Sequence, residues 1–324
     1  MDKKFKILIA YDGSEAADHA IKSLRSAGLP QVAEVLVMSV ADVFLPPAIS
    51  EEDMFPPHEP EVVRRAHECA EQKLRDAEEM AKCAAERINQ IFPDWQVRHE
   101  GVATSPAWAL IRKADEWKPD LVVIGARGHS VFGGRLILGS VSQRVLYEAK
   151  CSVRIARETT QYADSQIRVL IGIDHSKDSN AAVEAVCNRN WPKGTQVRLL
   201  AVVDTVMSIS PDPTRPSIMK WIEVSDEKNW DEVRQIFEPL AEKLRTVGLD
   251  AAVMIRRGNP TNELLDEANG WGADCVFLGS KGARGIDRLL LGSVSSAVAA
   301  RAECSVEIVR AKLTGGGRQA ASTS

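Results

Sequence analysis

Short, mostly apolar runs alternate with longer amphipathic stretches along the chain. Phe5–Tyr11 is the first such run, and its composition is typical of a strand that helices cover on both faces of a sheet. In the first half of the chain the predicted strands are Phe5–Tyr11, Glu34–Val40, Trp95–Gly101, Asp120–Gly125 and Ser152–Arg157. In the second half they are Ile167–Ile173, Gln196–Val202, Ala251–Arg256, Asp274–Leu278 and Ser305–Val309.

The stretches between these strands carry apolar residues at helical spacing. Ala17, Ala20 and Leu24 share one face of the first, and Gly28 ends it. The predicted helices are Ala16–Ala27, Glu61–Ile91, Pro106–Trp117, Val141–Ala149, Ser179–Arg189, Asp226–Val247, Asn262–Asn269 and Val294–Arg301. Strands that alternate with helices indicate an α/β fold with a doubly wound, five-stranded parallel sheet in each half.

The same order of elements occurs twice with matching local sequences. Ile7–Ser14 matches Val169–Ser176, and Cys151–Arg157 matches Cys304–Arg310. A repeat of roughly 150 residues indicates a duplicated domain rather than a solenoid. We expect two tandem domains, 1–158 and 167–311, joined by the polar linker 158–166 and followed by a disordered, low-complexity tail, 312–324.

Composition excludes several classes of function. The net charge of −4 offers no basic face for nucleic acid. No run approaches the roughly 18 apolar residues of a membrane span, so no membrane insertion is expected. Met1–Lys4 leads straight into the first strand without a signal-peptide core, which favours a cytoplasmic protein. The six cysteines form no Cys-x-x-Cys pair and the six histidines no metal-binding pattern, so buried thiols and no structural metal are expected.

A glycine-containing segment lies between the fourth strand and the last helix of each half. In the second half it runs from Gly279 through Gly282 to Gly292 and Ser293. Glycine lets a backbone approach a ligand, and a helix start offers unpaired N–H groups, so the segment is a candidate phosphate site. It is not a Walker A loop, and a purely structural turn is an equal alternative. The first-half residues are Gly125, Gly128, Gly139 and Ser140.

Ligands of open parallel sheets bind at the carboxyl ends of the strands. An acidic residue follows the first strand of each half, Asp12 or Asp174, and can accept hydrogen bonds from an amine or a hydroxyl. Val40 or Val202 ends the second strand and can flank a flat ring. With the phosphate loop, this set describes a nucleotide site. The alternative, that each aspartate only caps the next helix, stays open.

With these residues the chain resembles the universal stress protein family, whose signature is Gly-x2-Gly-x9-Gly-Ser/Thr. The second half fits it, whereas ten residues separate Gly128 from Gly139 in the first half. The resemblance implies two Rossmann-like domains of the adenine nucleotide α-hydrolase type and a bound ATP, with or without Mg²⁺. The residues it implies in the second half are Asp174, Val202, Gly279, Gly282, Gly292, Ser293, Val294 and Ser295. In the first half they are Asp12, Val40, Gly125, Gly128, Gly139, Ser140, Val141 and Ser142.

The family's fifth strand usually lies at a dimer interface. The resemblance therefore implies that Ser152–Arg157 and Ser305–Val309 face each other across a pseudo-two-fold axis, which makes the chain an intramolecular pseudo-dimer. A homodimer of two chains is left open.

The preferred hypothesis is a regulatory stress-response protein that binds an adenine nucleotide, with no catalytic residues assigned. A weak ATPase or autophosphorylating protein is the first alternative, because it would use the same loop. The second is a protein-interaction module, suggested by the proline-rich loops Phe44–Pro57 and Val206–Pro216, whose protein partner the sequence does not identify.

Overall fold

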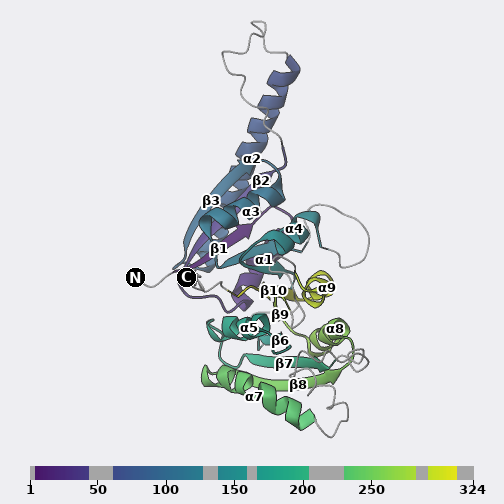
Figure 1. The fold of residues 1–324 in the computed structure, drawn as a ribbon. Coiled ribbons are helices and arrows are strands. Elements are labelled where there is room, and N and C mark those ends of the chain that lie inside the picture. Colours follow the sequence, from purple (N-terminus) through teal and green to yellow (C-terminus); the bar gives the residue numbers. More distant parts are fainter. Residues whose placement is uncertain are drawn as a thin grey trace, which may run out of the picture.

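The computed structural model describes residues 4–43, 61–126, 138–158, 166–203, 230–281 and 291–311 (Figure 1). Gly128, Gly282, the two proline-rich loops and the tail lie outside these residues, so the predictions made for them are untested.

Helices and strands occur in the predicted order. The first half contains β1 (Phe5–Ala10), α1 (Glu15–Ser23), β2 (Ala33–Ala41), α2 (Glu61–Ile91), β3 (Gln96–Ala103), α3 (Pro106–Trp117), β4 (Leu121–Gly125), α4 (Ser140–Glu148) and β5 (Ser152–Ala156). The second half contains β6 (Arg168–Ile173), α5 (Lys177–Cys187), β7 (Gln196–Val203), α7 (Trp230–Thr246), β8 (Asp250–Arg257), α8 (Pro260–Trp271), β9 (Cys275–Gly279), α9 (Ser293–Arg301) and β10 (Ser305–Val309).

Two predicted helix boundaries differ for identifiable reasons. The last turn of the first helix tightens into a 3₁₀ turn, Leu24–Ser26. Helix α8 begins at Pro260 rather than at Asn262, because the Asn259 side chain accepts hydrogen bonds from the backbone N–H groups of Thr261 and Asn262 at 3.1 and 3.3 Å. The proline occupies the first helical position, where its fixed φ suits a helix start.

All the strands form one ten-stranded sheet in the order β3-β2-β1-β4-β5-β10-β9-β6-β7-β8. Each half contributes the order 3-2-1-4-5 with parallel neighbours, so the predicted doubly wound parallel sheet is confirmed. The two halves join where β5 pairs antiparallel with β10. The prediction that the fifth strands face each other is therefore confirmed.

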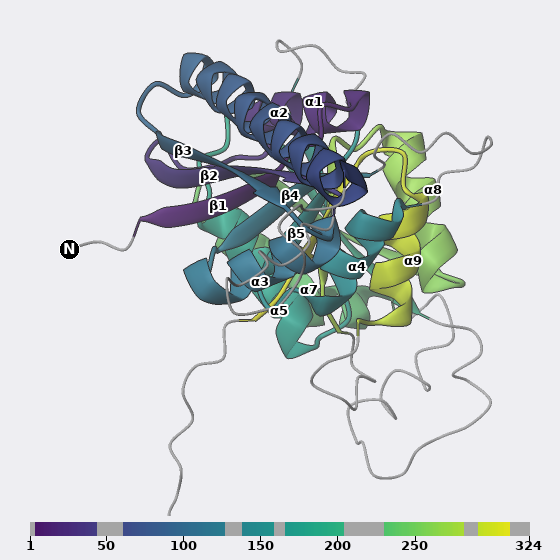
Figure 2. The ribbon, with the colours of Figure 1, turned by 90° about the horizontal axis from the view of Figure 1, so that it is seen from above.

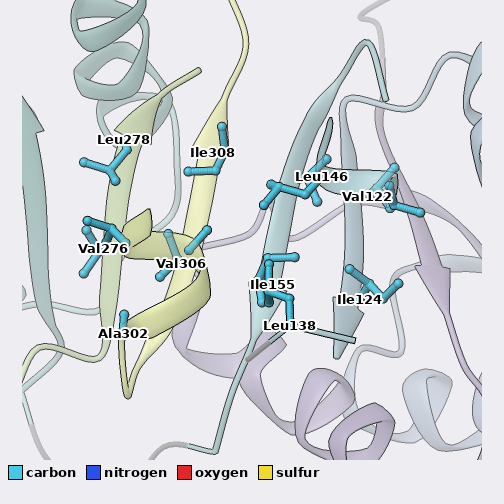
Figure 3. Close-up of a cluster of buried hydrophobic side chains, with 14 of the residues drawn as sticks. Val122, Ile124, Leu138, Leu146, Ile155, Val276, Leu278, Ala302, Val306 and Ile308 are labelled. Atoms are coloured by element: carbon cyan, nitrogen blue, oxygen red, sulfur yellow. The ribbon is translucent and has the colours of Figure 1, made fainter. Parts of the chain in front are cut away.

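Helices cover both faces of this sheet (Figures 1 and 2). On one face, α3, α4, α8 and α9 pack over a single hydrophobic cluster that crosses from one half to the other. Figure 3 shows its centre, where Ile155 of β5 lies near Val306 and Ile308 of β10, and all three are fully buried. On the other face each half has its own cluster, under α1 and α2 in the first half and under α5 and α7 in the second.

Two arginines at equivalent positions tie the halves together. Arg157 donates to the carbonyls of Ala299 and Ala300, at the end of α9, at 2.5 and 3.2 Å. Arg310 donates at 2.6 Å to the carbonyl of Leu146, in the last turn of α4, and at 3.0 Å to that of Cys151, just before β5. Each arginine thus caps the last helix of the opposite half, where a cation complements the helix dipole.

All six cysteines are unbridged, as predicted. Cys275 and Cys304 are buried, but Cys69 and Cys83 are exposed on the outer side of α2, so the expectation of buried thiols was wrong for this pair. None of the helices in the described ranges combines the length and the apolar character that a membrane crossing requires.

Candidate functional site

The turn after the first strand of each half is built around its aspartate. Asp12 Oδ1 accepts hydrogen bonds from the backbone N–H and the hydroxyl of Ser14 at 3.0 and 2.6 Å. Asp174 Oδ1 accepts the N–H of Ser176 at 3.1 Å. The two serines, rather than the aspartates, are the N-caps of α1 and α5. The aspartates therefore do not cap the helices themselves, as the alternative supposed, but hold the capping serines in place. Asp12 is exposed and Asp174 is half-buried.

The residue after each aspartate has a left-handed backbone. Gly13 has φ +74° and its counterpart His175 has φ +64°, a conformation that costs a residue with a Cβ free energy. The His175 ring is exposed and contacts Phe237 of α7 edge-to-face, with ring centroids 6.0 Å apart. In the described structure His175 therefore makes a packing contact.

The first glycine of each loop is required by close packing. A Cβ on Gly125 would lie 2.7 Å from the carbonyl oxygen of Ala16, and a Cβ on Gly279 would lie 2.5 Å from the backbone of Asp178. The first turn of α1 or α5 therefore rests directly on the end of β4 or β9. This approach brings the aspartate turn beside the start of the glycine loop.

The last glycine of each loop begins a helix that has no side-chain cap. Gly139 and Gly292 are the N-caps of α4 and α9, with extended backbones (φ −62°, ψ 153° and 146°). Their own N–H groups donate to the carbonyls of Ala126 and Ser280 at 2.9 and 2.8 Å, which closes the base of each loop. The next three N–H groups of each helix have no intrahelical acceptor and lie at the positive end of the helix dipole.

The first three residues of each helix divide into outward and inward positions. Ser140 and Ser293 are exposed, and Val141 and Val294 are half-buried against the shared cluster. Ser142 and Ser295 are buried, and their hydroxyls donate to the carbonyls of Gly125 and Gly279, both at 2.7 Å. These two hydroxyls bind the helix to the end of the strand. Ser142 and Ser295 would therefore contact a ligand through their backbone N–H groups.

Val40 and Val202 complete an apolar wall. Both are half-buried at the ends of β2 and β7 and pack against the same cluster as Val141 and Val294. Each half therefore presents a carboxylate, an apolar wall and an uncapped helix start along the carboxyl ends of its strands. Asp12, Val40 and Gly125 lie at the carboxyl ends of strands of the first half, as do Asp174, Val202 and Gly279 in the second, and Gly139 and Gly292 precede the last helix of each half.

Sequence reasoning missed one feature of the second half. Asp178 Oδ2 accepts the hydroxyl of Ser280 at 2.6 Å and the N–H of Lys281 at 3.0 Å, which fixes the entry of the glycine loop. The first half has Ala16 and Ala126 at the corresponding positions and lacks this anchor. The second loop is thus held more firmly at its entry.

A second missed feature lies beside the first site. The Tyr11 hydroxyl donates to Asp18 at 2.8 Å, and Arg87 of α2 donates to the same Asp18 oxygen at 2.7 Å. Burial, followed by the hydrogen bond to Asp18, raises the pKa of Tyr11.

Within the described ranges no group of three or more His, Cys, Asp or Glu side chains could hold a metal ion.

Comparison with known proteins gives a consistent result. A family model described as the universal stress protein family matches residues 5–157 and 167–310. A universal stress protein of Mycolicibacterium smegmatis is 30% identical over 324 residues, which span 95% of this chain and 97% of that protein. A universal stress protein of Thermus aquaticus is 34% identical over 151 residues, 47% of this chain and 97% of that protein.

A solved structure supports the same fold. The crystal structure of a universal stress protein from Archaeoglobus fulgidus superimposes with a TM-score of 0.62 at 22% identity, covering 94% of this chain and 98% of that one. The similarity extends over both halves of the chain.

Proposed function

Because the chain belongs to the universal stress protein family, we propose that it is a stress-response regulator that binds ATP at the carboxyl ends of the strands in each half. The observation that carries this proposal is the uncapped start of α9 and its duplicate at α4. Each begins with glycine, has no side-chain cap and carries in its first turn a valine that packs against the same cluster as the valine at the end of the second strand of its half. In this proposal residues 1–158 and 167–311 are the two domains, each with its own site.

The phosphates of ATP would accept hydrogen bonds from the N–H groups of Ser293, Val294 and Ser295. Anions are stabilised at such helix starts by the N–H groups and the dipole together. The Ser293 hydroxyl, which is exposed, would add a donor. A Mg²⁺ ion bound with ATP would be held mainly by phosphate oxygens and water.

The base and ribose would lie at the opposite end of the site. Val202 offers an apolar surface for a flat ring. The carboxylate of Asp174 would accept hydrogen bonds from a ribose hydroxyl or the adenine amine. Asp12 and Val40 would act in the same way in the first half.

The second half is the stronger candidate. Its loop has the family spacing, and Asp178 holds its entry through Ser280 and Lys281. An entry segment fixed before binding loses less conformational freedom when the ligand binds. We therefore expect tighter ATP binding in the second half than in the first.

The test removes one N–H group without disturbing the helix. Ser293 is the first residue of α9, a position that accepts proline, and the backbone of Gly292 (φ −62°, ψ 146°) already has the extended conformation that a residue before proline needs. Ser293→Pro should weaken ATP binding about 10-fold or more, because a hydrogen bond to a charged group contributes about 1.5–3 kcal/mol.

Isothermal titration calorimetry with ATP and AMP would measure the effect. Ser293→Ala is the matched control that keeps the N–H and removes only the hydroxyl. Ser140→Pro applies the same change to α4 and should affect the other, weaker site. An unchanged melting temperature would show that the helix is intact. ATP binding by a double Ser140→Pro and Ser293→Pro variant with wild-type affinity would contradict the proposal.

A further inference from the structure

The two halves carry opposite charges at the axis that relates them. Arg154, in the middle of β5, lies directly opposite Glu307, in the middle of β10. Their side chains are 0% and 1% exposed, and Arg154 NH1 lies 3.6 Å from Glu307 Oε2. Buried charges are rare and need a partner, so this pair calls for an explanation.

The register shows that the pair lies on the pseudo-two-fold axis. Val153 pairs with Ile308, and Ile155 pairs with Val306, symmetrically on either side. In the sequence repeat, Cys151–Arg157 matches Cys304–Arg310, so Arg154 and Glu307 are equivalent positions. At this point of the junction each strand faces its own counterpart.

Several other contacts of the junction would form equally well between two identical halves. Arg157 and Arg310 cap opposite helices in the same way. The N–H of Arg157 donates to Ser305 Oγ at 3.1 Å, and the N–H of Arg310 donates to Ser152 Oγ at 3.3 Å. These symmetric contacts stabilise the junction but cannot distinguish one half from the other.

The groups around the axis pair, in contrast, differ between the halves. Arg189, at the end of α5, donates to both carboxylate oxygens of Glu307. Arg154 donates to the sulfur of Cys275 at 3.0 Å. The equivalent first-half positions are Ala27 and Leu121, which cannot make these contacts. The second half is thus built to hold a carboxylate and to receive a guanidinium from the first.

We propose that Arg154 and Glu307 restrict the pairing partner of each fifth strand to the fifth strand of the opposite half. A second copy of the chain could offer β5 to β5 or β10 to β10. The first arrangement would bury two guanidinium groups face to face, and the second would bury two carboxylates. Like charges at short range in a poorly solvated interior repel strongly. The two guanidinium groups would also lack a counterion, whereas each carboxylate would keep only the Arg189 of its own half. The pair therefore excludes symmetric pairing of two chains through this strand.

Full-length chains with a single charge change test this restriction. Arg154→Glu makes both axis residues acidic, and Glu307→Arg makes both basic. Each variant alone should lose the pairing of its own halves. When the two variants are co-expressed with different tags, β5 of one chain can pair with β5 of the other through opposite charges, and the same holds for β10.

Native mass spectrometry should then show a 1:1 heterodimer in at least tenfold excess over either homodimer. Lys193→Glu, an exposed charge reversal, is the control for the change in net charge and should behave as the wild type. Failure of the two variants to form a mixed dimer in excess would overturn the proposal.

If a single variant fails to fold, a variant in which the charges at positions 154 and 307 are exchanged within one chain still tests the proposal. Arg154→Glu with Glu307→Arg restores opposite charges across the junction. Because Arg189 would then face a new arginine, the exchange also carries Arg189→Met and is compared with Arg189→Met alone. The exchanged chain should recover the melting temperature and the oligomeric mass of that reference. If it is as unstable as the single variants, the charge pattern does not decide the pairing.

Discussion

A glycine at the contact between the halves permits a close approach that a single methyl group should disrupt. Gly28 follows the 3₁₀ turn at the end of α1 and has φ +60°. A Cβ at this position would lie 2.5 Å from Cδ2 of Trp191, which belongs to the other half. The carbonyl of Gly28 also accepts the N–H of Asn190 at 2.9 Å. Gly28→Ala should therefore weaken the packing of one half on the other.

Two separate costs contribute to the effect. A left-handed backbone costs a residue with a Cβ about 1–2 kcal/mol. Forcing a methyl group into a packed contact adds about 1–3 kcal/mol. Trp191 cannot easily move, because its Nε1 donates to the carbonyl of Val186 at 2.8 Å and its ring contacts Phe277 edge-to-face at 6.1 Å. The free energy of unfolding should thus fall by about 2–5 kcal/mol.

Gly248 provides a matched control for the first cost. It also has a positive φ, +87°, but a Cβ there would have no neighbour within 4 Å. Gly248→Ala should therefore lower the free energy of unfolding by only about 1–2 kcal/mol. The difference between the two variants isolates the contact with Trp191.

Urea unfolding followed by tryptophan fluorescence and far-ultraviolet circular dichroism would measure both variants. Replacing the indole in a Gly28→Ala, Trp191→Leu double variant should recover the excess loss relative to Trp191→Leu alone. Equal losses for Gly28→Ala and Gly248→Ala would refute the reasoning, because they would show that the indole adds no steric cost.

Two further outcomes follow from the environments of titratable groups. Iodoacetamide at pH 8 should alkylate the exposed Cys69 and Cys83 first and leave Cys151 largely unmodified, because burial raises the pKa of Cys151 to about 11. Peptide mass spectrometry would measure the labelling of each cysteine. Equal labelling of Cys151 would contradict this prediction. Burial acts to raise the pKa of Asp18, but the hydrogen bonds from Arg87 and Tyr11 and the charges of Arg87 and Lys22 together outweigh it, so the pKa is lowered on folding. The ionised carboxylate therefore stabilises the fold above its unfolded pKa of about 4. Asp18→Asn should therefore lower stability at pH 7, and the difference from the wild type should vanish as the pH falls through the folded pKa below 4; a difference that persists at pH 2 would rule out this cause.

Much of the fold could be predicted because it depends on local patterns. Apolar runs and helical spacing predict the order of strands and helices, and the repeat predicts that the order occurs twice. The start of α8 was misplaced by two residues, because a turn with Asn259 and Pro260 and a capped helix start look alike in sequence. Only the backbone geometry distinguishes them.

The candidate site could be predicted in position but not in detail. The aspartates, valines and glycines follow apolar runs, and parallel strands bring such positions to one edge of the sheet. The sequence did not show that Ser142 and Ser295 point inward to the carbonyls of Gly125 and Gly279. That direction depends on how α4 and α9 rest on the strands, which no local pattern records.

By itself, the sequence determined that this chain is a duplicated α/β unit with paired glycine loops, because propensity, periodicity and repetition act over short distances. The tertiary structure alone decided which side chains meet. Asp178 reaches Ser280 and Lys281 across 102 and 103 positions of the chain, and Arg154 lies opposite Glu307 across the junction. Such contacts depend on strand register and helix placement, which arise only when the whole sheet is assembled.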